Sequence, residues 1–170
     1  SEGIMQTLVE VAPKVRENQR DYDAMATYML SATMALNGFV AMGVKQDWAT
    51  HMIGHELTAL HGLTHGHTLV IVLPALMSVM RQQKGAKIAQ MGERVFGICE
   101  GDANSRIDRT IEATEAFFRS LGLTTRLTEE GIGEETIAES ERRFAERGTA
   151  LGEQGNIDAN VARQILERAL

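Results

Sequence analysis

The chain has 170 residues, 44% hydrophobic and 24% charged, which is typical of one folded domain with a real core. Its net charge of −6 provides no basic stripe, which argues against nucleic acid and anionic membranes as partners. The single cysteine, Cys99, excludes an internal disulfide, and the longest apolar run, 69–76, is too short to span a bilayer. These features predict a cytoplasmic protein.

Apolar residues recur at helical spacing along the whole chain, and no stretch alternates as a strand does. In chain order, helices are expected over 4–15, 22–36, 48–60, 65–80, 86–98, 107–121, 135–147 and 158–169. The fourth is apolar nearly all round and should be buried. Pro13 is expected to kink or interrupt the first helix, and Lys84 with Gly85 to form a turn. The prediction is an all-α bundle of about seven or eight helices.

All five histidines lie between His51 and His67. His51 and His55 are four residues apart, which places them about 40° apart on one helix face. After a break at Gly62, an antiparallel helix would bring His65 back toward them. Neutral imidazoles grouped in this way suit a divalent metal, with zinc or ferrous iron preferred.

The same stretch is not a zinc-protease motif, because His55 and His61 are six residues apart rather than four. Asp47 could add a carboxylate, but a helix N-cap is the simpler interpretation. His61 and His67 are left without an assigned role. Two or three histidines are fewer than a complete zinc site needs, so the stretch predicts half a metal site.

Two neighbours of the histidines have alternative interpretations. Trp48 is expected in the core, with a wall of a substrate pocket as the alternative. Glu56 is expected as a solvated glutamate, with orientation of an imidazole as the alternative.

The run "QDWATHMIGHELTALHGLTHGHTLVIVLPALM", residues 46–77, resembles the metal-binding signature of the iron-containing (group III) alcohol dehydrogenases. It is most similar to their butanol-dehydrogenase-like, NADPH-dependent aldehyde reductase branch. His51, His55 and His65, followed by Leu73–Pro74, match that signature in order and spacing.

The resemblance implies that residues 1–170 are the helical metal-binding domain of a two-domain dehydrogenase, a fragment lacking an N-terminal dinucleotide-binding domain. His51 and His65 would be metal ligands, and His55 a catalytic neighbour. An aspartate and another histidine would complete the site, but their D-x3-H element is not found upstream of His51.

The resemblance also implies an activity, hydride transfer between NADP(H) or NAD(H) and an aldehyde carbonyl polarised by Fe2+ or Zn2+. The nicotinamide would be bound mainly by the missing domain. We expect small alcohols and aldehydes as substrates, a homodimer, and no activity in the isolated fragment. The rival hypotheses are a free-standing helical metal-binding or sensing module and a helical interaction domain with incidental histidines.

Overall fold

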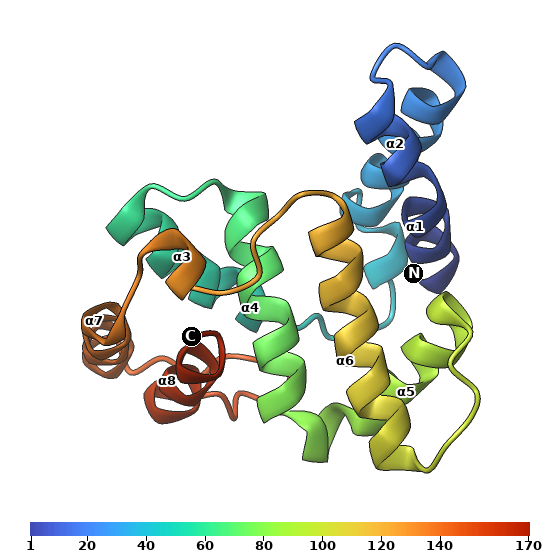
Figure 1. Ribbon diagram of the computed structural model, residues 1–170. Helices are drawn as coiled ribbons and strands as arrows, with labels where there is room; N and C mark the ends of the chain where they lie inside the picture. Colours follow the sequence, from blue (N-terminus) through green and yellow to red (C-terminus); the bar gives the residue numbers. More distant parts are fainter. The chain divides into compact units, whose positions relative to one another are not determined.

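The computed structural model describes residues 1–170 as eight α-helices and two short 3-10 helices, with no strand (Figure 1). This confirms the predicted all-α class. The α-helices are α1 (Glu2–Glu17), α2 (Tyr22–Leu36), α3 (Ala49–His61), α4 (His65–Val79), α5 (Arg81–Phe96), α6 (Ala103–Ser120), α7 (Glu134–Glu146) and α8 (Ala159–Arg168). The 3-10 helices are η1 (Phe39–Ala41) and η2 (Thr128–Glu130).

The helices fall into two compact units. One comprises residues 1–44 and 85–122, and the other comprises 45–84 and 123–170. We call them the first and second unit. Every histidine belongs to the second unit.

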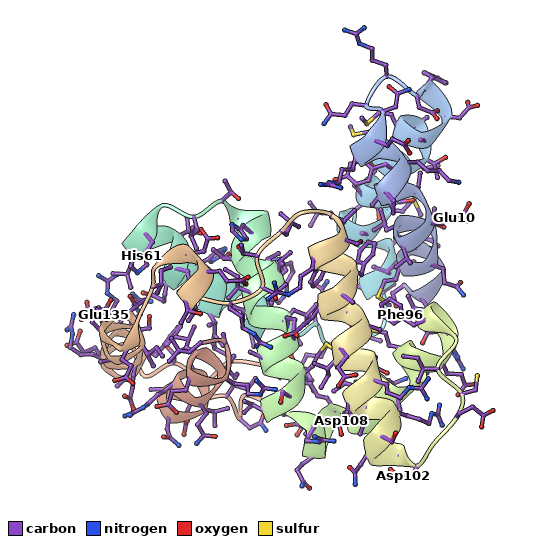
Figure 2. The ribbon with its side chains drawn as sticks, in the orientation of Figure 1. Glu10, His61, Phe96, Asp102, Asp108 and Glu135 are labelled. Carbon is purple, nitrogen blue, oxygen red and sulfur yellow. The ribbon has the colours of Figure 1, made fainter.

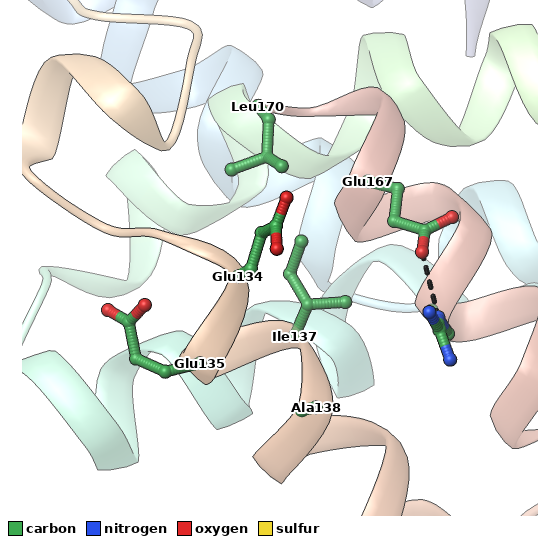
Figure 3. A pocket seen from close by; sticks show the side chains of 7 residues that line it. Glu134, Glu135, Ile137, Ala138, Glu167 and Leu170 are labelled. Carbon is green, nitrogen blue, oxygen red and sulfur yellow. Dashed lines mark hydrogen bonds and ion pairs between the residues drawn. The ribbon is translucent and has the colours of Figure 1, made fainter.

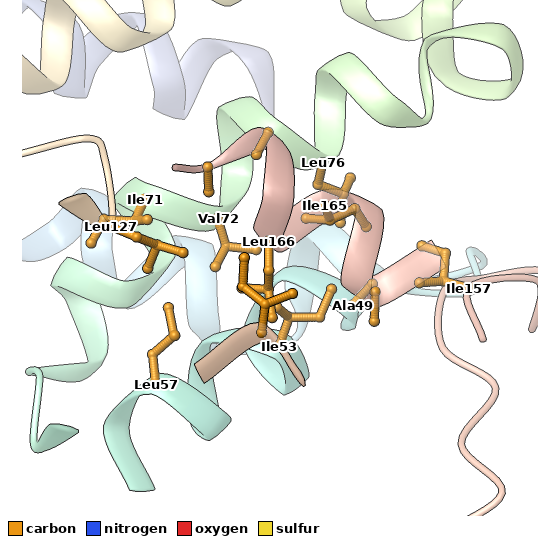
Figure 4. Close-up of a cluster of buried hydrophobic side chains, with 14 of the residues drawn as sticks. Ala49, Ile53, Leu57, Ile71, Val72, Leu76, Leu127, Ile157, Ile165 and Leu166 are labelled. Carbon is orange, nitrogen blue, oxygen red and sulfur yellow. The ribbon is translucent and has the colours of Figure 1, made fainter. Parts of the chain in front are cut away.

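The second unit has the larger apolar cluster, built from α3, α4, α7, α8 and the loops between them (Figure 4). Helix α4 is buried over most of its length, as its apolar sequence predicts. The most enclosed members, at 0–1% exposed, include Ile53, Leu57, Ile71, Val72, Leu127, Phe144, Ile157, Ile165 and Leu166. This core gives α3 a fixed buried side and leaves its other side free.

Helix α3 has clear start and stop signals. Asp47 Oδ1 accepts a hydrogen bond from the Ala49 amide at 2.7 Å, and Gly62 ends the helix with a φ of 70°. Gly54 then allows α3 and α4 to approach closely. A Cβ at Gly54 would lie 2.7 Å from Thr68 Oγ1 on α4. The helix pair that carries the histidines is therefore tightly packed.

The first unit contains α1, α2, α6 and most of α5. Its α5 and α6 meet at Gly92, where a Cβ would lie 1.9 Å from Thr110 Oγ1. Glu2 of α1 pairs with Arg94 of α5 at 2.7 Å. The stretch Tyr22–Ala41 is long and apolar enough to cross a membrane by length and composition, a test that soluble core helices and signal sequences also pass.

The structure corrects three sequence predictions. Lys84 and Gly85 do not form a turn; α5 runs through both, and the turn falls at Met80. Gly85 instead allows close packing, since a Cβ there would lie 2.8 Å from Ile107 Cδ1. Pro13 does not interrupt α1, which continues to Glu17. Helix α6 begins at Ala103, before the predicted start, because Asp102 caps the Ser105 amide at 2.9 Å.

Candidate metal and substrate site

Three histidines converge at the α3–α4 pair. His51 and His55 lie on α3, and His65 is the first residue of α4. The ring centroid of His65 lies 5.2 Å from that of His51 and 5.4 Å from that of His55. His51 is half-buried, whereas His55 and His65 are exposed. The antiparallel pair thus gathers the three residues that the sequence singled out.

These distances suit two imidazoles that share one metal ion. A metal–nitrogen distance of about 2.0–2.1 Å with tetrahedral angles separates two ring centroids by roughly 5 Å. Residues 1–170 contain no group of three or more His, Cys, Asp or Glu side chains arranged to hold a metal ion. The chain therefore offers a histidine pair that fits a metal, without a complete ligand set.

The surroundings of His51 favour its neutral imidazole form. Burial lowers the pKa of His51, and the neighbouring His65 and His55 lower it further, since positive charge on one ring disfavours positive charge on the next. A neutral imidazole nitrogen is the form that binds a metal.

Asp47 does not belong to the cluster. Its Oδ2 pairs with Lys84 Nζ at 2.6 Å, and Lys84 Nζ also contacts Glu153 Oε2 at 2.6 Å. With Oδ1 bound to the Ala49 amide, both carboxylate oxygens have partners. The N-cap of α3 is Trp48, so the N-cap prediction for Asp47 is wrong by one residue, although the Asp47 side chain still accepts from the Ala49 amide that begins the helix.

The two remaining histidines make structural contacts. His61, labelled in Figure 2, bonds Thr136 of α7, with Nε2 2.8 Å from Oγ1. His67 Nε2 lies 2.6 Å from Thr124 Oγ1, whose hydroxyl donates to Glu130 at 2.5 Å. They attach the ends of α3 and α4 to neighbouring segments.

Glu56 was predicted to be solvated, and that prediction is wrong. Its side chain is 6% exposed and pairs with Arg143 of α7 at 3.5 Å and with Arg147, the C-cap of that helix, at 2.5 Å. It orients no imidazole. The arginines are four residues apart at the end of α7, and that spacing was the only sequence signal for the pair.

Trp48 was expected in the core, and it is 45% exposed. Its ring meets the His51 ring edge-on, with centroids 4.9 Å apart and planes at 70°. The fold leaves the indole beside the histidines because the neighbouring Ala49, rather than Trp48, enters the core.

A hollow lies elsewhere in the second unit, between α7 and α8 (Figure 3). It is lined by Glu134, Glu135, Ile137, Ala138, Arg163, Glu167 and Leu170, with no histidine among them. Arg163 and Glu167 neutralise each other at 2.7 Å. The other two charged residues that line it, Glu134 and Glu135, are exposed. The hollow is therefore a weaker candidate site than the histidine cluster.

Sequence comparison matches residues 1–169 to the C-terminal part of the Fe-containing alcohol dehydrogenase family. The chain belongs to this family. It is 48% identical to the NADPH-dependent aldehyde reductase YqhD of Escherichia coli, a match that covers 99% of this chain and 44% of that protein. It is 42% identical to the NADP-dependent alcohol dehydrogenase 3 of Entamoeba histolytica, covering 98% of this chain and 42% of that protein.

Solved structures of the family agree. The substrate- and cofactor-free YqhD aldehyde reductase of E. coli superposes with a TM-score of 0.96, at 48% identity, over 99% of this chain and 45% of that one. The NADH-dependent butanol dehydrogenase A of Thermotoga maritima gives a TM-score of 0.90 at 32% identity, over 99% and 44%. The chain spans less than half the length of these family members.

Proposed function

We propose that this chain is the metal-binding half of an NAD(P)H-dependent alcohol dehydrogenase or aldehyde reductase, acting in the cytoplasm as a homodimer. The observation that carries the proposal is the convergence of His51, His55 and His65 at metal-pair distances in a chain of this family. The nicotinamide-dependent reactions named for its relatives support it.

In this proposal His51 and His65 hold a divalent ion, Fe2+ or Zn2+. When bound, the ion supplies Lewis-acid polarisation of an aldehyde oxygen. The other ligands come from residues outside 1–170. Asp47 is not one of them, because Lys84 and the Ala49 amide occupy its oxygens.

His55 is the proposed proton donor. It is exposed next to His65, with the two ring centroids 5.4 Å apart. A bound nicotinamide would supply the hydride for the carbonyl carbon, and a ring nitrogen of His55 would donate the proton to the carbonyl oxygen. The balanced products are the alcohol and NAD(P)+. The isolated chain is inactive, since the nicotinamide is bound mainly outside it.

Aldehyde-dependent NADPH oxidation tests this proposal, measured on the chain extended upstream by a full domain. We expect the wild type to be active, His51→Ala and His65→Ala to lose activity with their metal, and His55→Ala to keep metal but lose about 10²-fold or more in kcat. His61→Ala is the matched control and should retain activity. Metal binding without any NAD(P)H oxidation would contradict the enzyme and favour a metal-sensing module.

A further inference from the structure

Lys84 binds two carboxylates that come from different parts of the second unit. Its Nζ lies 2.6 Å from Asp47 Oδ2 and 2.6 Å from Glu153 Oε2. Asp47 immediately precedes Trp48, the N-cap of α3, and Glu153 lies in the loop between α7 and α8. The Lys84 side chain is only 17% exposed, so water screens these ion pairs little. The proposed reaction uses none of the three charged residues.

The Glu153 side of this cluster is fixed by its own hydrogen bonds. Glu153 Oε1 accepts from Gln83 Nε2 at 3.3 Å, and Gln83 Oε1 accepts from Asn156 Nδ2 at 2.6 Å. Two backbone hydrogen bonds between Leu151 and Ile157, of 2.8 and 3.1 Å, close the same loop. Ile157 is 0% exposed, which anchors the loop in the core. Glu153 is therefore a fixed point against which the lysine can hold another group.

The Asp47 side of the cluster leads to the metal pair. Asp47 Oδ1 accepts from the Ala49 amide at 2.7 Å, so one carboxylate binds both the lysine and the first turn of α3. His51 lies on that same turn. The Trp48 ring, directly after Asp47 in the chain, meets the His51 ring edge-on with 4.9 Å between centroids. A displacement of Asp47 would therefore move the backbone and the ring that orient His51.

The lysine charge is what keeps the two carboxylates together. Two carboxylate oxygens that lie 2.6 Å from one nitrogen are close enough to repel each other when that cation is absent. We propose that Lys84 is a positioning residue for His51. Its ammonium neutralises Asp47 and Glu153, and so keeps the first turn of α3 where its histidine faces that of α4. This inference rests on the proposed function and adds a residue that acts on the metal pair through α3.

Zinc affinity tests this role, measured by equilibrium dialysis on the chain extended upstream by a full domain. We expect Lys84→Met to lower the affinity about 10–100-fold, the range typical of losing a group that orients a metal ligand. Lys84→Arg keeps the cation and should bind zinc as the wild type does. Ile165→Val is the matched control, because it removes one methyl group from the same core and no charge, and it should also bind as the wild type does.

A double variant separates positioning by charge from a general loss of stability. When Lys84→Met is combined with Glu153→Gln, the repulsion is absent and the new amide can donate to Asp47. The double variant should recover most of the zinc affinity that Lys84→Met loses. No recovery, or an equal loss in Ile165→Val, would overturn the positioning role. Unchanged affinity in Lys84→Met would overturn it as well, and would leave the proposed function standing.

Trp48 gives a readout that requires neither metal nor turnover. It is the only tryptophan of residues 1–170, so its emission in the extended chain is the part that Trp48→Phe removes. Lys84→Met should change this emission, because the indole loses its fixed contact with His51, and Lys84→Arg should not. If no protein in the series binds zinc, the proposed function fails. A change of emission in Lys84→Met alone would still support the positioning of α3, and identical emission in all of them would overturn it.

Discussion

His51 and His65 come from different helices. Substituting them one at a time tests whether each imidazole contributes to metal binding. In the chain extended upstream, His51→Ala and His65→Ala should each lower metal affinity by more than the roughly 10–100-fold typical of losing a supporting partner of a ligand. Equilibrium dialysis with metal analysis measures this. His61→Ala removes an imidazole bonded to Thr136 and should leave affinity unchanged. Equal metal affinity in all three variants would contradict the assignment.

Lys84 provides a second prediction at the scale of single residues. Burial raises the pKa of Asp47, but hydrogen bonds from Lys84 and the Ala49 amide outweigh it and lower that pKa overall. Burial lowers the pKa of Lys84, but Asp47 and Glu153 outweigh it and raise that pKa overall. Lys84→Met should therefore lower the free energy of unfolding by about 1–3 kcal/mol near neutral pH.

The pH dependence of this difference in unfolding free energy follows from the directions of the Asp47 and Lys84 pKa shifts. The contribution of Asp47 is present above its unfolded pKa of about 3.9 and is lost as pH falls through the lower folded value. The contribution of Lys84 is present below its unfolded pKa of about 10.4 and is lost as pH rises through the higher folded value. Urea unfolding of the wild type and of Lys84→Met should show a constant difference in unfolding free energy from about pH 5 to 10, and a smaller difference outside that range. A gap that is as large at pH 2 as at pH 7 would refute the ion pair.

Single residues were predictable where their roles depend on local spacing. The spacing of His51 and His55 and the return at Gly62 were enough to predict that His65 joins them. Glu56 and Trp48 were misassigned for a physical reason. The arginines that neutralise Glu56 lie 87 and 91 positions away, and no local pattern reports such a pairing.

At the scale of elements, Gly54 sets the distance between α3 and α4. A methyl group there would lie 2.7 Å from Thr68 Oγ1, and Thr68 is fully buried while donating to the His65 carbonyl at 2.8 Å. Gly54→Ala should therefore push the helices apart, disturb the first turn of α4 and destabilise the protein by about 1–3 kcal/mol. Thermal or urea unfolding measures the change.

Gly66, in α4, is the matched control. A Cβ there meets nothing within 4 Å, so Gly66→Ala should be neutral or stabilising by up to about 1 kcal/mol. Equal stability of the two alanine variants would show that α3 and α4 are not closely packed at Gly54.

The helices themselves were largely predictable, because amphipathic spacing and caps such as Asp21 and Asp158 are local signals. The positions at which consecutive helices join were less predictable. Gly85 resembled a turn residue in sequence, but its lack of a side chain serves contact with Ile107 of another helix. The sequence does not distinguish a glycine that close packing requires from a glycine that a turn requires. Only the tertiary contact distinguishes the two.

At the scale of the whole molecule, the chain spans 44% of its E. coli relative and contains the histidine pair without a third and fourth ligand. The central claim is that this pair is part of a dehydrogenase metal site completed by residues outside 1–170. In the proposed function, the five clustered histidines are one pair of ligands, one proton donor and two structural contacts.

The most direct test is the metal content per chain after dialysis against a chelator, compared between residues 1–170 and the chain extended upstream by a full domain. The account predicts about one equivalent of iron or zinc in the extended protein and almost none in residues 1–170, because two imidazoles alone bind too weakly. One equivalent retained by residues 1–170 alone would contradict it.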